Sequence, residues 1–212
     1  MIKFVKNYFE PNGVDRVLVG KCCEHISKNK ISGAIIEIGT RRGGGAVMIA
    51  ESLERFNSTN RLFVCVDPYG NIEYQDTDGP PQTFDYTNAM RDETIPKLHE
   101  HIGGMGFNFM FLNMEDTEFF KRFPDGIPVY SYRKQTENSY AFVFLDGPHA
   151  VEPIKLEIEY FLPKIPKGGI ILFDDTNRYN HAVIDEIILN SGFKVFSSTS
   201  NGYEFKVAYI KE

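Results

Sequence analysis

The sequence has no long apolar segment, no run of basic residues and few cysteines. None of its apolar runs reaches the roughly 18 residues of a membrane-spanning helix, and residues 1–8 lack the apolar core of a secretory signal. The net charge of −6 disfavours a nucleic-acid partner, because phosphate binding requires a basic face. The 3 cysteines are Cys22, Cys23 and Cys65. Their odd number and the adjacent pair favour reduced thiols and a cytoplasmic protein over a disulfide framework.

Residues 34–50 are the stretch around which the rest of the chain is organised. They begin with a short apolar run that ends at Glu37 and Gly39, as a buried parallel strand does at its carboxyl end. From Ala46 onward, apolar residues recur with helical spacing. Gly39 and the glycines at 43–45 allow a tight turn and the close approach of a ligand to the backbone. Ligands of open α/β sheets bind outside the carboxyl ends of the strands, so this turn is the first candidate for a functional site.

The remaining apolar runs predict an α/β fold. Four further runs are expected to be strands, at 62–67, 107–112, 140–146 and 170–175. Segments with helical spacing separate them, and two final runs at 193–196 and 205–210 are expected to pair as an antiparallel hairpin. We therefore expect a doubly wound, mostly parallel seven-stranded sheet with one antiparallel edge strand. A chain of 212 residues with 42% apolar content is typical of one domain, over 1–212.

Three segments lie outside this alternation. Residues 1–30 are expected to form a helical lead-in that covers one edge of the sheet, with helical spacing at Val14, Val17, Leu18 and Cys22. Residues 68–85 form a long loop, and its aromatic residues either line a substrate or pack against the body: Tyr69, Tyr74 and Phe84. Residues 124–139 are typical of a surface insertion with a hairpin pattern. The sequence leaves open whether this insertion shapes an acceptor pocket or a homo-oligomer contact.

Acidic residues follow four of the expected strands, and parallel pairing should bring them to one edge of the sheet. They are Glu37, Asp67, Asp146, Asp174 and Asp175. Asp67 either accepts hydrogen bonds from both hydroxyls of a ribose or caps the turn that begins at Pro68. The ribose interpretation is favoured, because Asp67 should lie beside Glu37 and the glycine turn.

The sequence predicts that Asp146, Asp174 and Asp175 lie close together. Three like charges would raise each other's pKa values, and a divalent cation relieves the repulsion. All-oxygen ligands suit Mg²⁺, and a hydroxyl bound to Mg²⁺ loses its proton more readily. Without a metal, one or more of the acids would have to stay protonated or have basic partners. His149 is the first candidate for the base that takes the proton and His181 the second. The alternative for each histidine is that it caps a helix or faces solvent.

The ordered motifs resemble those of class I S-adenosylmethionine-dependent methyltransferases. Residues 37–44 look like motif I of that family, and Asp67 matches the acid that the family places on the ribose. Three later segments are similar to small-molecule O-methyltransferases of the macrocin (TylF) type and their methyltransferase 24 relatives, namely 145–149, 166–169 and 173–176. The resemblance covers about residues 33 to 210.

This resemblance implies a Rossmann-like fold, S-adenosylmethionine as cofactor and a set of site residues. The implied cofactor residues are Glu37, Gly39, Thr40, Arg41, Gly43, Asp67, Pro68, Asn113, Met114 and Asp146. The loop 113–116 is expected near the adenine, and the implied Mg²⁺ ligands are Asp146, Asp174 and Asp175. Where relatives often carry a third acid that serves as base, this chain has Pro148, so the base is less defined than the cofactor.

The predicted function is a Mg²⁺-assisted, S-adenosylmethionine-dependent O-methyltransferase that acts on a hydroxyl of a small molecule or sugar. An NAD-dependent oxidoreductase is a weaker alternative, because its Gly-x-Gly-x-x-Gly fingerprint is replaced here by Gly39-x-x-x-Gly43. A non-catalytic, cofactor-binding subunit of the same fold is the other alternative, since a fold does not fix a function.

Overall fold

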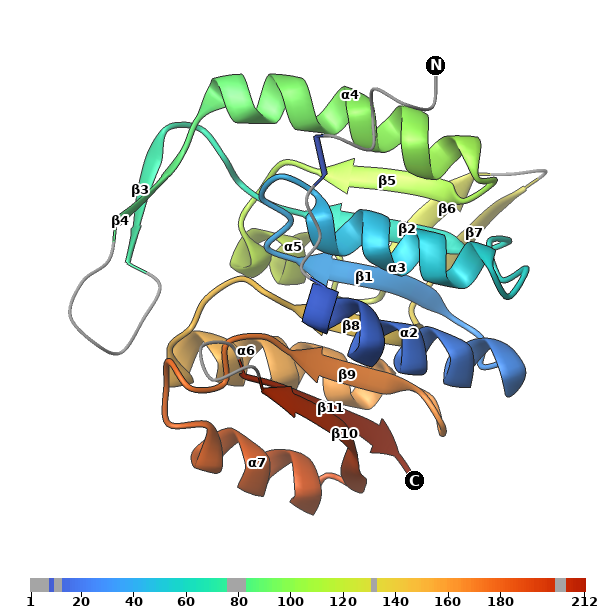
Figure 1. Cartoon of the computed structure of the whole chain (residues 1–212), viewed down its shortest axis with the longest axis vertical. Helices are drawn as coiled ribbons and strands as arrows, with labels where there is room; N and C mark the ends of the chain where they lie inside the picture. Colours follow the sequence, from blue (N-terminus) through green and yellow to red (C-terminus); the bar gives the residue numbers. More distant parts are fainter. Residues whose placement is uncertain (1–7, 10–12, 76–82, 131–132, 201–204) are drawn as a thin grey trace.

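Seven strands form one central sheet, and helices cover both of its faces (Figure 1). The computed structural model describes residues 8–9, 13–75, 83–130, 133–200 and 205–212. The strands are β1 (Ala34–Ile38), β2 (Leu62–Val66), β5 (Asn108–Leu112), β8 (Tyr140–Leu145), β9 (Ile170–Phe173), β10 (Phe193–Ser200) and β11 (Phe205–Lys211). Their order is β10-β11-β9-β8-β1-β2-β5. β11 runs antiparallel to β9 and β10, and the other neighbouring pairs are parallel, so the predicted fold class is confirmed.

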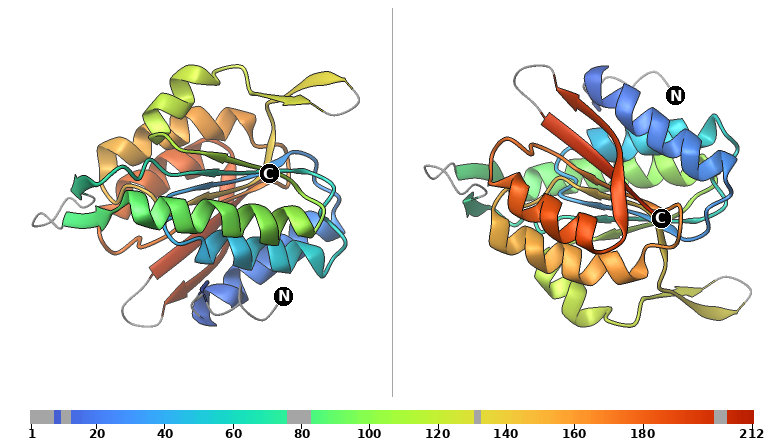
Figure 2. Two further views of the ribbon diagram at one scale, coloured as in Figure 1. Left: turned by 90° about the horizontal axis from the view of Figure 1, so that it is seen from above. Right: turned by 90° about the horizontal axis from the view of Figure 1, so that it is seen from below.

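The helices form one layer on each face of the sheet (Figure 2). One layer consists of α2 (Gly13–Lys28), α3 (Gly44–Glu54) and α4 (Asn88–Gly104). The other consists of α5 (Asp116–Arg122), α6 (Val151–Phe161) with the 3₁₀ turn Leu162–Lys164, and α7 (His181–Asn190). All five residues of β1 are buried, as expected for a parallel strand covered on both faces. Among the described residues, no helix has the length and apolarity to cross a bilayer.

Helix α2 packs beside α3 and over the edge strand β10, so it covers one edge of the sheet as the sequence predicted. Its buried positions are Leu18, Val19, Cys22, Cys23 and Ile26. Val17, which the sequence assigned to the same stripe, is 62% exposed. Leu18 and Cys22 are therefore buried as predicted, and Val19 takes the buried position that the sequence gave to Val17.

Two small hairpins extend from the sheet. β6 (Ile127–Tyr130) and β7 (Lys134–Glu137) pair antiparallel, which confirms the hairpin predicted for the insertion 124–139. β3 (Ile72–Gln75) and β4 (Thr83–Tyr86) pair within the segment that the sequence predicts as a loop. The side chains of Tyr74 and Phe84 lie outside the described part of the chain. Tyr69 is fully buried and stacks near Phe111, so it packs against the body.

Gly39 joins the first strand to its turn at a point where no side chain fits. It has a φ of 84°, in the left-handed region that favours glycine. A Cβ on this residue would lie 2.1 Å from the backbone oxygen of Asp146, at the end of the neighbouring strand β8. The close approach of these two strand ends sets the floor of the site described below.

Gly39→Ala is expected to lower the free energy of unfolding by about 2 kcal/mol or more, because neither the φ nor the backbone contact tolerates a methyl group. Urea denaturation monitored by circular dichroism measures the change. Gly20→Ala is the matched control, since a Cβ there meets nothing within 4 Å inside helix α2. That substitution should stabilise the protein by roughly 0.5–1 kcal/mol. Equal midpoints for the two variants would contradict the strand-contact argument.

Glu157 is an acid inside the apolar face of α6. It is fully buried beside Ile154 and Ile158, and neither of its carboxyl oxygens has a hydrogen-bond partner among the described residues. Burial raises the pKa of Glu157 well above its usual value, and the nearby Asp116 raises it further. The carboxyl of Glu157 therefore ionises at a higher pH in the folded protein than in the unfolded chain.

Glu157→Gln is expected to stabilise the protein increasingly as the pH rises. Because the folded pKa exceeds the unfolded one, the wild type loses stability above pH ~4, by up to roughly 1.4 kcal/mol per pH unit, and the neutral variant does not. Urea midpoints between acidic and weakly alkaline pH measure the difference. The control is Glu152→Gln on the same helix, whose side chain is 81% exposed and pairs with Lys155. Parallel curves for Glu157→Gln and the wild type would refute the raised pKa of Glu157.

Candidate functional site

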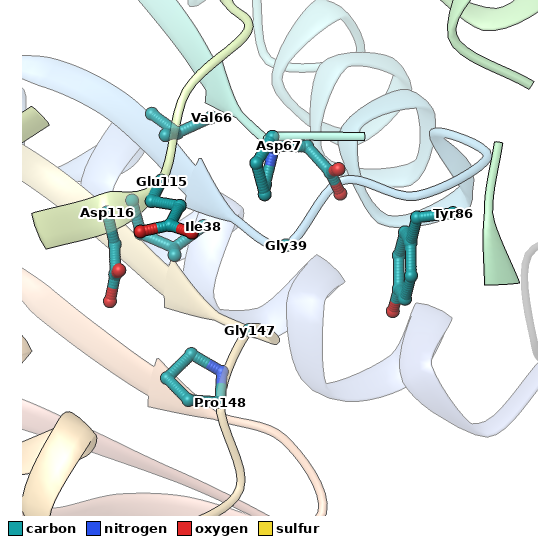
Figure 3. Close-up of a pocket in the computed structure, with 10 residues that line it drawn as sticks. Ile38, Gly39, Val66, Asp67, Tyr86, Glu115, Asp116, Gly147 and Pro148 are labelled. Atoms are coloured by element: carbon teal, nitrogen blue, oxygen red, sulfur yellow. The ribbon is translucent and has the colours of Figure 1, made fainter. Parts of the chain in front are cut away.

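A pocket opens at the carboxyl ends of β1, β2 and β8 (Figure 3). Its empty volume is about 700 Å³, which includes the open mouth. The lining residues are Ile38, Gly39, Val66, Asp67, Pro68, Tyr86, Glu115, Asp116, Gly147 and Pro148. The pocket thus lies where the glycine turn predicted a ligand, and Gly39, Asp67 and Pro68 line it as expected.

Asp67 ties the glycine turn to the segment after β2. Its Oδ2 accepts a hydrogen bond from the backbone N–H of Arg41 at 2.7 Å, and its Oδ1 accepts one from Tyr69 at 3.2 Å. Arg41 and Tyr69 have φ values of 46° and 47°, so the carboxylate stabilises two strained residues at once. Burial raises the pKa of Asp67 to about 6, although the two backbone donors oppose the shift. An ionised carboxylate has about four lone-pair sites, so capacity remains for a ligand hydroxyl.

Glu37 supports the turn from below and does not line the pocket. It is 1% exposed, and a Cβ on Gly45 would lie 2.2 Å from its Oε1. Cys65 lies on the neighbouring strand, with its Sγ 3.7 Å from Glu37 Oε2. Burial raises the pKa of Glu37 to about 8, and the charge of Asp67 adds to the shift. Glu37 is therefore placed to hold the strand-to-helix turn, and the glycine at position 45 makes room for it.

The segment after β5 contributes two acids to the pocket wall. Glu115 and Asp116 line the pocket at the start of α5. Asn113 donates from Nδ2 to the backbone oxygens of Asp67, at 3.0 Å, and of Pro68, so it braces the pocket rim. Met114 packs against the hydrophobic core. The loop 113–116 therefore adjoins the pocket, and its last two residues line it.

Sequence reasoning missed Tyr86 and the glycine-proline pair after β8 as parts of the pocket wall. Tyr86 ends β4, immediately before Thr87, whose side chain caps helix α4 by accepting from the N–H of Met90. The Arg41 guanidinium lies 6.0 Å from the centre of the Tyr86 ring. The sequence signal near Tyr86 is the helix-capping Thr87, which marks the start of α4. It does not indicate that the Tyr86 ring faces the pocket.

The acids after β8 and β9 are brought together as predicted. Leu145 pairs with Phe173 in the sheet, so Asp146 and Asp174 follow side by side. The N–H of Asp174 donates to the carbonyl of Leu145 at 2.9 Å. Burial raises the pKa of Asp146 well above its usual value, the charge of Asp174 raises it further, and Lys206 opposes the shift.

Basic side chains already accompany these acids. Lys206 from β11 is 3% exposed, and its ammonium donates to Asp174 Oδ1. The Nε of Arg178 lies 2.9 Å from Asp175 Oδ2, and the Nε2 of His149 lies 3.7 Å from the same oxygen. Burial raises the pKa of Asp175, and the charge of Asp174 raises it further. The sequence left open whether these acids, without a metal, stay protonated or have basic partners. The structure shows basic partners for Asp174 and Asp175.

The carboxylate cluster does not fit a divalent metal as it is arranged. A cation-binding Asp174 would have to exchange the Lys206 ammonium for the ion, and Asp175 is paired with Arg178. Among the described residues, no group of three or more His, Cys, Asp and Glu side chains has the geometry to hold a metal. The prediction of Mg²⁺ at Asp146, Asp174 and Asp175 therefore has no support from the positions of these side chains.

The two candidate bases are placed differently. His149 is 6% exposed and adjoins Asp175. His181 begins α7, with Nδ1 3.0 Å from the hydroxyl of Tyr179 and Nε2 2.7 Å from that of Tyr209. Burial lowers the pKa of His181. Its ring is therefore part of a hydrogen-bond network with two tyrosines. Neither histidine is among the residues that line the pocket, although His149 follows the lining residues Gly147 and Pro148.

Comparisons with known proteins agree with this architecture. The methyltransferase domain family matches residues 36–176, while no curated protein sequence matches the chain. The structure of the O-methyltransferase NovP is 16% identical with a TM-score of 0.61, over 93% of this chain and 79% of that one. The calicheamicin methyltransferase CalS11 is 16% identical with a TM-score of 0.64, over 91% and 77%. An O-methyltransferase from Bacillus cereus, solved with SAH, is 14% identical with a TM-score of 0.59, over 99% and 87%.

At these identities the structural likeness shows the fold. The family match includes the end of β1, the glycine turn, Asp67 and the acids after β8 and β9, and it shows the family. The chain therefore belongs to the methyltransferase domain family and is a class I, S-adenosylmethionine-dependent methyltransferase.

Proposed function

We propose that the protein transfers a methyl group from S-adenosylmethionine to a hydroxyl of a small molecule or sugar, as O-methyltransferases of the macrocin (TylF) type do. The observation that carries the proposal is the pocket at the carboxyl ends of β1, β2 and β8, with Asp67 on its wall. Asp67 lies beside the glycine turn, where a carboxylate can accept hydrogen bonds from both hydroxyls of a ribose.

The charge of the pocket suits this cofactor better than a dinucleotide. Three acids line it, namely Asp67, Glu115 and Asp116. S-adenosylmethionine carries a positive sulfonium and no phosphate, so acidic walls attract it. The pyrophosphate of NAD is negative and requires backbone donors at a helix N-terminus, whereas this wall would repel it. The structure of the pocket therefore favours methyl transfer over the oxidoreductase alternative.

The structurally similar proteins support an oxygen acceptor. NovP is described as an O-methyltransferase, CalS11 as a TDP-rhamnose 3'-O-methyltransferase, and TomG from Streptomyces achromogenes as an O-methyltransferase in complex with SAM. The TM-score of TomG is 0.55 at 13% identity. Two of these proteins belong to biosynthetic routes for small molecules, calicheamicin and tomaymycin. The acceptor proposed here is of the same chemical kind.

The chain's own residues supply binding and proton transfer. Bound S-adenosylmethionine supplies the methyl group on its sulfonium, and much of the rate comes from holding that methyl in line with the acceptor oxygen. His149 takes the proton of the acceptor hydroxyl, and the carboxylate of Asp175, 3.7 Å from its Nε2, stabilises the imidazolium that forms. Asp67 and Asn113 fix the nucleoside end, because Asn113 braces the backbone that carries Asp67.

Asp67→Asn is expected to weaken S-adenosylhomocysteine binding by roughly 10–100-fold, because an amide replaces one of two acceptor oxygens facing the ribose. Isothermal calorimetry with this probe measures it. The wild-type affinity should also fall as the pH drops through about 6, where Asp67 takes up a proton, and the variant should lack this dependence. The control is Asp92→Asn, an exposed acid on α4. A wild type that does not bind the probe at millimolar concentration would end the proposed function.

His149→Gln is expected to lower kcat by roughly 100-fold or more, because the proton acceptor is lost, while calorimetric affinity for S-adenosylhomocysteine stays within about twofold. The acceptor is found first by measuring S-adenosylhomocysteine release against a panel of hydroxylated small molecules and nucleotide sugars. His99→Gln, an exposed histidine on α4, serves as control. Unchanged turnover in the His149 variant would remove His149 from the reaction. No release with any panel member would favour the non-catalytic subunit.

A further inference from the structure

Lys206 is a buried lysine inside the carboxylate cluster of the proposed acceptor site. Lys206 is only 3% exposed, and a lysine is almost never buried to that degree without a charged partner. The partner is Asp174, whose Oδ1 accepts a hydrogen bond from the ammonium. No part of the methyl-transfer scheme above uses this lysine.

The sheet register explains why the lysine reaches the acids. β11 pairs antiparallel with β9, and Val207 lies opposite Phe173, so Lys206 and Asp174 occupy the next positions on their strands. β8 pairs with β9 on the other side, which brings Asp146 to the same place. The three strands thus converge on one ammonium, and its charge acts on Asp146 and Asp175 as well as on Asp174.

We propose that the Lys206 ammonium is a built-in counter-ion that takes the place of a divalent metal in the carboxylate cluster, so that the protein binds no divalent cation there. The proposal deepens the function proposed above and rests on it only for the identity of the acceptor site. Asp174 is then fixed by Lys206 and Asp175 by Arg178, so both carboxylates have a basic partner from the chain itself and the acceptor is held without metal chelation.

Lysine and metal exclude one another at this position for an electrostatic reason. A divalent ion on Asp174 would lie beside an ammonium that is bonded to the same carboxylate, in a site with little water to screen the repulsion. Removal of the ammonium favours metal binding. Three neighbouring carboxylates without a cation raise each other's pKa values, and a divalent ion that binds there stabilises their charged forms. The arrangement therefore predicts opposite metal affinities with and without the lysine charge.

The test is a titration of the full chain with Mn²⁺, which favours the same oxygen ligands as Mg²⁺ and has an electron paramagnetic resonance signal that weakens on binding. The wild type is expected to leave the signal unchanged up to millimolar Mn²⁺ and to keep its melting temperature within ~1 °C. Lys206→Met is expected to bind Mn²⁺ at least roughly tenfold more tightly than the wild type. Its melting temperature should rise with Mn²⁺ concentration.

Lys194→Met is the matched control. Lys194 lies on β10 in the same hairpin, pairs with Glu212 at 2.8 Å and has a side chain that is 62% exposed. This variant should behave as the wild type does in Mn²⁺. If Lys206→Met does not fold, Lys206→Gln replaces it, because its amide can still donate to Asp174 without the charge.

Saturable Mn²⁺ binding by the wild type, with a rise in melting temperature, would overturn the proposal. A folded Lys206 variant that binds Mn²⁺ no better than the wild type would overturn it too. Calorimetry with S-adenosylhomocysteine on the same samples separates this failure from failure of the proposed function. A wild type that binds both the cofactor product and Mn²⁺ refutes only the role of Lys206, whereas one that does not bind the cofactor product refutes the methyl transfer.

Discussion

The need to compensate buried acids at one edge of the sheet shapes this protein. Parallel pairing of β1, β2, β8 and β9 brings their carboxyl ends together, so the acids that follow these strands cannot avoid one another. Four of these five acids are compensated in ways that the structure shows directly. Asp67 accepts two backbone N–H groups, Glu37 has a pKa of about 8 and is protonated at neutral pH, Asp174 is paired with Lys206, and Asp175 is paired with Arg178. The buried carboxyl groups at this edge of the sheet are therefore accompanied by hydrogen-bond donors or basic side chains.

The same acids hold strained backbone in place. Arg41, Tyr69 and Asp175 have φ values of 46°, 47° and 46°, which side chains other than glycine rarely adopt. The first two donate to Asp67, and the third carries a carboxylate that is paired with Arg178. Strain of this kind persists where the surroundings fix it, and it gathers at functional sites. The pocket wall is therefore shaped before any ligand arrives, which lowers the entropic cost of binding.

The site has two halves with different origins in the fold. The proposed cofactor half is built from β1, β2 and the segments that follow them, which are close in sequence and form one βαβ unit. The proposed acceptor half is built from β8, β9 and β11, whose partners lie far apart in the chain. Gly39 joins the halves, since its lack of a side chain lets the turn after β1 contact the end of β8.

The sequence by itself determined the sheet, the glycine turn and the positions of the acids, because buried parallel strands and tight turns leave local signals. Ile38, Gly39 and Asp67 lie where the apolar runs and the turn placed them, and the hairpin of β10 and β11 follows from the short connection between them. The sequence determined less well which side of a helix is buried. Neighbouring apolar residues in α2 permit more than one buried side, and Val17, which the sequence assigned to that side, is exposed.

Only the tertiary structure decided what accompanies each acid. Lys206 lies 32 residues from Asp174 in the chain, and nothing local marks it as a buried partner. Glu157 was hidden in the same way, because a single acid within an apolar stripe looks like a solvent-facing one until the neighbouring helices are in place. The physical reason is that strand register and helix packing, which arise from contacts across the whole chain, set which charges meet and whether water reaches them.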